Sequence, residues 1–263
     1  MPGFHIKNHS SRFRKIINQK NTPMKKGWIV LIVLTLGLSC RPGRNDEGFS
    51  GNSGTFKDLR DGQEYQWIRV GDQIWMAENL RYDCGHLVTR DEEWKGLTPE
   101  AKACCWPNND NTMDNYGMLY TYAAALEACP AGWHLPTDEE WAGLVKFVEK
   151  DGHKGQVATA LKSAESWAWE SYEGENGEEG GNGDDDYGFN ALPAGCRYSS
   201  NGSFQDLGYL AYWWTATPDG EGAAMARVMA NNPEEIRGLE RDIYDRTRGL
   251  SVRCIKDAPD QTK

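Results

Sequence analysis

Two short segments, each with one cysteine, constrain the fold of this chain more than any other feature. The first runs from Cys129 to Trp141 and combines a cysteine, a proline that ends one helix and a Pro-Thr-Asp-Glu-Glu run that begins another. The second, from Gly249 to Lys256, alternates like a short strand around its cysteine. A disulfide between the two segments would close a very long loop and fix the shape of a whole domain.

Residues 1–39 differ from the rest of the chain and indicate a signal peptide. They contain seven Lys or Arg and no acid, and an apolar run from Trp28 to Leu38 ends just before Cys40. This run is too short to cross a membrane, which takes about 20 apolar residues. Met24 is a natural start for such a signal, so we interpret residues 1–23 as an over-called start or an unusual basic region.

The Leu-Ser-Cys sequence that ends at Cys40 resembles a bacterial lipobox, although its leucine stands one position nearer to the cysteine than usual. In a lipobox the cysteine is lipidated and becomes the first mature residue; an ordinary secretory signal is the alternative. The following acidic pair, Asp46 and Glu47, resembles the surface-export tags of Bacteroidota lipoproteins. We therefore expect residues 40–57 to be a lipidated, flexible tether and the protein to be an outer-membrane lipoprotein, on the periplasmic or cell-surface face.

The charge of the exported chain argues against a nucleic-acid partner. The formal net charge of −10 becomes −17 once the seven basic residues of the leader are removed. Phosphate binding needs a basic face, and no stretch of this chain clusters enough Lys or Arg to make one.

Cysteine usage indicates up to three disulfides, because an even number remains after Cys40 is set aside and exported chains are oxidised. The remaining cysteines are Cys84, Cys104, Cys105, Cys129, Cys196 and Cys254. The adjacent Cys104 and Cys105 lack the Cys-x-x-Cys spacing that is typical of zinc sites. From the residues alone, the pairing stays open.

The apolar periodicity predicts an α+β domain with an antiparallel sheet, over residues 58–258, followed by a tail over 259–263. Residues 65–70 and 73–76 flank a Gly-Asp turn and indicate a hairpin. Helices are expected over about 120–128 and after the Thr137 capping box, where an apolar stripe follows. Strands are expected in the apolar runs 187–193, 209–217, 223–229 and 250–255.

Seven blocks of sequence, in order, resemble the Fibrobacter succinogenes major paralogous domain. They are Asp61–Tyr65, Trp75–Leu80, Tyr116–Tyr120, Cys129–Trp141, Tyr187–Gly195, Tyr212–Thr217 and Ser251–Cys254. This family is commonly carried by exported lipoproteins, and its biochemical function is largely undefined. The pattern also resembles the C-type lectin-like fold, including its distant relatives around the formylglycine-generating enzymes. This second resemblance implies two to three helices, an antiparallel sheet and long loops, all held together by disulfides.

The resemblance implies that Cys129 pairs with Cys254, joining the first helix to the last strand. The resemblance leaves Cys84 to pair with Cys104 or Cys105, and we take Cys104 as the partner. The partner of Cys196 stays open. Lectin-like folds hold ligands on loops above a rigid sheet. We therefore expect a binding module, not an enzyme, that recognises a glycan or a surface protein.

Aromatic side chains are the candidates for contact with a sugar face, and core packing is the alternative for each. They are Trp167, Trp169, Tyr172, Tyr198, Trp213 and Trp214. Of the adjacent pair Trp213 and Trp214, one should point inward, because neighbours on a strand face opposite sides.

Calcium is a possible cofactor, because oxygen ligands gather in the acidic, glycine-rich surface loop from Gly174 to Asp186. The candidates are Asn182, Asp184, Asp185 and Asp186. A simply solvated loop is the alternative, and the Glu-Pro-Asn motif of calcium-dependent sugar sites is absent.

Two other functions compete with a binding module. A structural or assembly component of the cell surface fits the tether and anchor equally well. A formylglycine-generating-enzyme-like activity would need cysteine chemistry, for which Cys196 is the candidate, although an ordinary disulfide is the alternative in an oxidising compartment.

Overall fold

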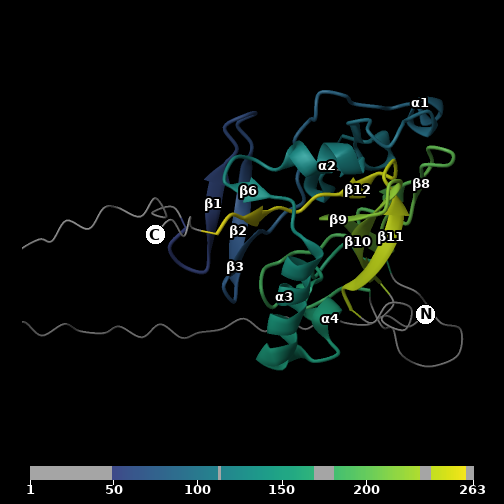
Figure 1. Ribbon diagram of the computed structural model, residues 1–263. Helices are drawn as coiled ribbons and strands as arrows, with labels where there is room; N and C mark the ends of the chain where they lie inside the picture. Colours follow the sequence, from purple (N-terminus) through teal and green to yellow (C-terminus); the bar gives the residue numbers. More distant parts are fainter. Residues whose placement is uncertain (1–48, 112–113, 169–180, 232–237, 259–263) are drawn as a thin grey trace, which may run out of the picture. The chain divides into compact units, whose positions relative to one another are not determined.

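The first sheet joins the beginning and the end of the domain. The computed structural model describes residues 49–111, 114–168, 181–231 and 238–258 (Figure 1). In the sheet the strands follow the order β1-β2-β3-β13-β6, and all the described pairings are antiparallel. They are β1 (Ser53–Lys57), β2 (Glu64–Val70), β3 (Gln73–Met76), β13 (Ile255–Lys256) and β6 (Trp133–His134). The predicted hairpin is confirmed, with Val70 opposite Gln73 and Gly71 at a φ of 60°.

The second sheet follows the order β11-β10-β9-β12-β5-β4. Its strands are β11 (Glu240–Asp245), β10 (Ala223–Ala230), β9 (Leu210–Asp219), β12 (Leu250–Ser251), β5 (Leu119–Tyr120) and β4 (Cys104–Cys105). Only the β12–β9 pairing is parallel among the described strands. A small ribbon pairs β7 (Cys196–Arg197) with β8 (Phe204–Gln205). The sheets and helices confirm the α+β class.

The expected strand over residues 187–193 is wrong. This segment is irregular apart from one isolated bridge at Ala191. Gly188 and Asn190 both take positive φ angles, 68° and 51°, which break the extended conformation. The buried Phe189 explains the apolar signal: it anchors a turn rather than a strand.

Both predicted helices are present. The first, α2, spans Tyr122–Ala128, and the second, α3, spans Asp138–Val148. The capping box forms as expected: the Thr137 side chain accepts from the backbone of Glu140, whose carboxylate accepts from the Thr137 backbone. Two shorter α-helices were not predicted, α1 (Asp91–Lys95) and α4 (Val157–Leu161).

Strand β9 lies between two clusters of buried apolar side chains. Tyr212 and Trp214 belong to one cluster, while Ala211 and Trp213 belong to the other. Because successive side chains point to opposite faces, a strand that is covered on both faces buries all of them.

A buried arginine joins distant parts of the chain. The guanidinium of Arg253 donates to Oδ1 of Asn79 at 2.8 Å and to the carbonyls of Phe189 and Asn190. The same Oδ1 accepts from the Trp213 indole at 2.8 Å. Burial lowers the pKa of Arg253 to about 9. The arginine therefore holds the irregular 187–193 segment against β9 and the residues after β3.

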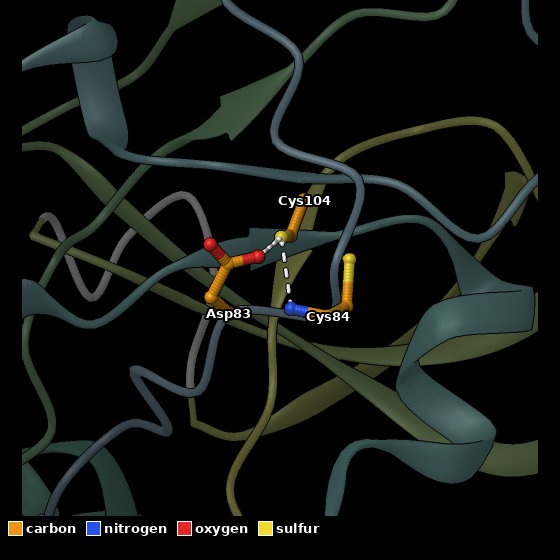
Figure 2. A group of neighbouring side chains, drawn as sticks. All are labelled: Asp83, Cys84 and Cys104. Atoms are coloured by element: carbon orange, nitrogen blue, oxygen red, sulfur yellow. Dashed lines mark hydrogen bonds between the residues drawn. The ribbon is translucent and has the colours of Figure 1, made fainter. Parts of the chain in front are cut away.

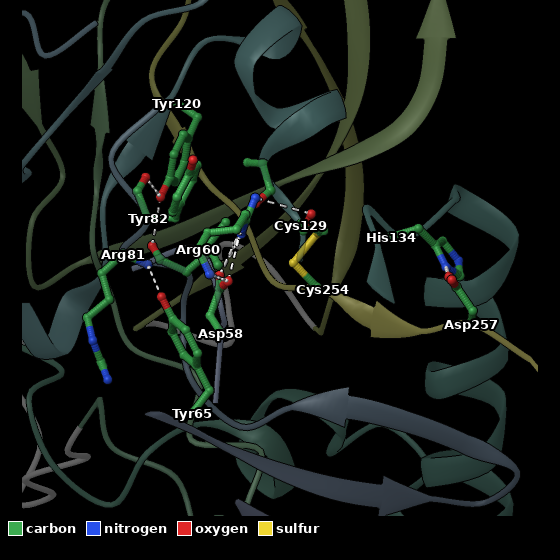
Figure 3. Close-up of a disulfide and its surroundings, with 12 residues drawn as sticks. Asp58, Arg60, Tyr65, Arg81, Tyr82, Tyr120, Cys129, His134, Cys254 and Asp257 are labelled. Carbon is green, nitrogen blue, oxygen red and sulfur yellow. Dashed lines mark hydrogen bonds and ion pairs between the residues drawn. A yellow bond between two sulfur atoms is a disulfide. The ribbon is translucent and has the colours of Figure 1, made fainter. Parts of the chain in front are cut away.

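The Cys129–Cys254 disulfide is present, with 5.9 Å between the two Cα atoms and 125 residues of separation. Figure 3 shows Arg60 beside it, paired with Asp58 at 2.6 Å and donating to the Ala128 carbonyl at 2.7 Å. The Arg60 guanidinium also lies 3.7 Å from the centre of the Tyr82 ring. The residues between β1 and β2 thus fasten the end of helix α2 where the disulfide begins.

The ordered domain begins earlier than expected. Strand β1 starts at Ser53, inside the segment expected to be a tether, and Phe56 stacks on Trp133 with 4.5 Å between ring centres. Residues 1–39 and Cys40 lie outside the described residues, so the signal peptide and lipidation stay predictions. Within the described ranges, no helix combines the length and apolarity needed to cross a membrane.

Candidate functional site

Three of the aromatic candidates are buried and cannot contact a ligand. Trp213 and Trp214 point to opposite faces of β9, as expected, but neither has exposed surface, because both faces are covered. Trp167 is 2% exposed, and its indole donates to the Ala191 carbonyl at 3.0 Å. Trp169 and Tyr172 lie outside the described residues.

Tyr198 is half-buried, and an arginine covers one face of its ring. The Arg248 guanidinium lies 4.0 Å from the centre of the Tyr198 ring and 4.6 Å from that of Tyr244. A sugar could not stack on the face that Arg248 occupies.

The expected calcium ligands do not converge. Oδ1 of Asn182 accepts from the backbone of Trp167 at 3.0 Å, and Oδ1 of Asp185 accepts from the backbone of Asn190 at 2.7 Å. Asp186 lies 3.6 Å from the His153 ring, while Asp184 is exposed. Among the described residues, these carboxylates do not form a metal-ligating group. The part of the loop over residues 174–180 lies outside the described residues.

Cys84 and Cys104 are separate thiols, which does not agree with the disulfide taken for them. Figure 2 shows Cys104 beside Asp83, with 3.8 Å between Sγ and Oδ1, and the Cys84 backbone N–H donates to the same sulfur at 3.3 Å. The Cys84 sulfur instead lies 3.9 Å from the carbonyl oxygens of His86 and Lys102. Asp83, Cys84 and Cys104 nevertheless bring three ligand atoms within 4.8 Å of one another.

Cys196 has no disulfide partner and is buried. Its sulfur lies 3.6 Å from Oδ2 of Asp206, which also accepts from the Tyr212 hydroxyl at 2.8 Å. Burial raises the pKa of Cys196 to about 12, with the Asp206 carboxylate acting in the same direction. A buried thiol that resists ionisation is a poor nucleophile, which weighs against cysteine chemistry at this position.

A groove of about 580 Å³ lies on the first sheet, between its two N-terminal strands and a turn. Residues 52–55 and 66–69 form the strand side, and residues 186–188 form the opposite wall. The volume is within the range of small-ligand sites, about 300–1,000 Å³. Asp186 is the one candidate site residue from the sequence that lines it.

Polar side chains surround an apolar part of this groove. Ile68 is buried, and Gln66, on the same face of β2, and Asp186 are exposed, whereas the Arg69 side chain lies on the opposite face of the sheet. The turn faces the Ile68 side chain at Gly188, whose φ of 68° favours glycine. The groove therefore offers an amide and a carboxylate beside a hydrocarbon surface, which suits a polar ligand with apolar faces.

Both walls of the groove are held in position. Arg69 donates to the carbonyls of Gly51 at 3.1 Å and Phe49 at 2.9 Å, which fixes the chain leading into β1. On the other side, the Tyr187 hydroxyl donates to Asp151 at 2.8 Å, and its ring packs edge-on against His153 with 5.6 Å between ring centres. A site with fixed walls loses little conformational entropy when a ligand binds.

Sequence reasoning did not find this groove. Gln66 and Arg69 have the pattern of ordinary strand positions, and Tyr187 was assigned to a strand. Of the lining residues, only Asp186 was a candidate, and it was expected to be a calcium ligand. The groove depends on contact between residues more than a hundred positions apart, and no local pattern signals such a contact.

Taken together, these features define a disulfide-closed α+β domain with a surface groove of ligand size. The model of the family described as the Fibrobacter succinogenes major domain matches residues 68–256, which is most of the chain, and the chain belongs to this family. The resemblance seen in the sequence is thus confirmed. No curated protein and no solved structure matches the chain.

Proposed function

We propose that this protein is an exported, lipid-anchored binding module of the cell envelope that recognises a glycan or a surface protein through the groove on the first sheet. The observation that carries the proposal is the groove itself, with fixed walls and with Gln66 and Asp186 beside the apolar Ile68. The buried Cys196, the one cysteine that the sequence left without a role, supports binding over cysteine chemistry.

A glycan is the ligand class that the groove favours. Sugars present hydroxyl groups, which bind carboxylates, amides and guanidinium groups, together with C–H faces, which pack on apolar surface. Asp186 can accept from hydroxyls, and Gln66 can both accept and donate.

Glycan-array binding by the mature chain tests this proposal. We expect Asp186→Asn and Gln66→Ala each to weaken binding about tenfold, which corresponds to loss of one well-formed hydrogen bond. Asp219→Asn is the matched control, because Asp219 is an exposed carboxylate on the second sheet, and it should bind like the wild type. Equal binding by all four proteins would exclude the groove as the site. No glycan signal, with an envelope protein co-purifying instead, would favour the structural or assembly role.

We also propose that the domain is a variant of the C-type lectin-like fold. Support comes from the disulfide that joins the end of α2 to the segment between the last two strands, and from the long irregular connections around the sheets. The lectin-like arrangement would present the ligand on loops, whereas the groove of this chain uses two strands and one turn.

Anchoring through Cys40 is the part of the proposal that the leader sequence supports. Palmitate labelling in cells should mark the wild type and not Cys40→Ala, because only a free thiol at that position can accept the lipid. The variant should appear in the soluble fraction. Equal labelling of both proteins would exclude lipidation at Cys40.

A further inference from the structure

We propose that Asp83, Cys84 and Cys104 form a binding site for a thiophilic divalent cation, of which Zn²⁺ is the representative. In the described parts of the chain, this is the one group of three or more Cys, His or acidic residues whose ligand atoms lie close enough to share an ion. Figure 2 shows the Asp83 carboxylate and the Cys84 backbone nitrogen directed toward the Cys104 sulfur, with the Cys84 sulfur to one side.

The ligand atoms are near the separation that a tetrahedral ion requires. With metal–ligand distances of about 2.3 Å for sulfur and about 2.1 Å for oxygen, neighbouring ligands stand about 3.6–3.8 Å apart. The Cys104 sulfur and Oδ1 of Asp83 are already 3.8 Å apart. The three ligand atoms all lie within 4.8 Å of one another, so a side-chain rotation at Cys84 completes the geometry.

The scaffold around the group is fixed. Cys104 lies in β4, opposite Tyr120 of β5, and its backbone N–H donates to the His86 carbonyl at 3.0 Å. The Tyr120 hydroxyl donates to the Tyr82 carbonyl at 2.8 Å, which holds the residue before Asp83. Oδ1 of Asp83 also accepts from the Gly85 backbone at 2.8 Å, so the carboxylate is oriented before an ion arrives.

Access and the fourth ligand both come from solvent. Cys104 is buried, but Cys84 is half-buried and Asp83 is exposed, so an ion can enter along the Asp83 side. Three protein ligands leave one position for water, as in zinc sites with an open coordination position.

The adjacent Cys105 does not take part. Successive side chains on a strand face opposite sides, and Cys105 packs instead into a separate buried cluster with Val88 and Trp94. The missing Cys-x-x-Cys spacing therefore does not exclude a metal site: the second thiolate comes from the segment before β4, not from within the cysteine pair.

A Cd²⁺ titration of the mature protein tests the site, with the ultraviolet band of thiolate-to-metal charge transfer as the readout. The protein is first treated with a mild reductant, and its mass must show that Cys129–Cys254 is intact. We expect one ion per chain with the intensity of two thiolates, half that intensity for Cys84→Ser, and displacement of Cd²⁺ by Zn²⁺. Asp83→Asn should keep the two-thiolate band and weaken binding at least about tenfold, as outer-shell changes already do.

Cys196→Ser is the matched control, because Cys196 is another buried thiol and lies outside the group. It should bind Cd²⁺ like the wild type. The proposal would be overturned if the wild type bound Cd²⁺ no better than Cys84→Ser. It would also be overturned if peptide mapping of the freshly exported protein showed Cys84 and Cys104 joined as a disulfide, because oxidation removes both sulfur ligands.

Discussion

The guanidinium of Arg253 is fully buried and bonded to neutral oxygens rather than directly to a carboxylate. A buried charge of this kind depends on the acceptors around it, because their hydrogen bonds replace those of the water it has lost. One of these acceptors, Asn79, comes from the Trp75–Leu80 block, and the others belong to the Tyr187–Gly195 block. Residues that look unrelated in the sequence are thus explained by one hydrogen-bonding centre.

Replacing Asn79 should be among the most destabilising polar changes in this domain. Asn79→Ala removes the acceptor for both Arg253 and the Trp213 indole. We expect the free energy of unfolding in urea to fall by about 3 kcal/mol, because a charged donor loses its partner. Asn201→Ala is the control: Asn201 accepts only within its own exposed turn, and the change should cost less than about 1 kcal/mol. Equal losses for both variants would contradict the central role of Asn79.

At the scale of elements, His134 joins three pieces of structure. It lies in β6, and its ring is bonded to Glu140 in the first turn of α3 at 2.9 Å and to Asp257 after β13 at 2.6 Å. The hydrogen bond to Glu140, followed by that to Asp257, raises the pKa of His134 to about 9. The protonated ring therefore helps to position α3 against the first sheet.

This raised pKa predicts a pH-dependent stability. Because the folded pKa lies above the unfolded value of about 6.5, the contribution is complete below that pH and is lost as the pH rises through 9. The ring is 39% exposed, so solvent screening keeps the effect below about 1 kcal/mol. Urea unfolding of the wild type should show this loss between pH 6.5 and 9, whereas His134→Gln should show a flatter profile. A wild-type profile as flat as that of the variant would contradict the ion pairs.

The elements that could be predicted from the sequence are those whose signals are local. The Gly71 turn and the Thr137 capping box are complete within a few residues, so the hairpin and helix α3 were predicted correctly. The burial of both Trp213 and Trp214 was not, because it depends on helices and loops that cover both faces of β9. The groove was missed for a similar reason: its walls come from segments that meet only in the folded chain.

At the scale of the whole molecule, the Cys129–Cys254 disulfide is the principal covalent restraint. Closing a loop with 125 residues of separation stabilises the fold by about 4–5 kcal/mol in the chain-entropy description. The double variant Cys129→Ala/Cys254→Ala should lose most of this amount in urea unfolding, and its melting temperature should fall. Cys196→Ala is the control, since it removes a buried thiol without opening a loop. A double variant as stable as the wild type would show that the bond is dispensable.

The position of the last strands has a consequence for how the protein is made. Strand β12 lies between β9 and β5 in one sheet, and β13 lies between β3 and β6 in the other. Neither sheet is complete until these final residues of the domain have joined it. On the export route that we propose, a chain that emerges N-terminus first cannot finish either sheet until its C-terminal end has crossed. The same holds for the long-range disulfide, since Cys254 lies between these two strands, so we expect the native state to be reached only after the last residues of the domain have crossed.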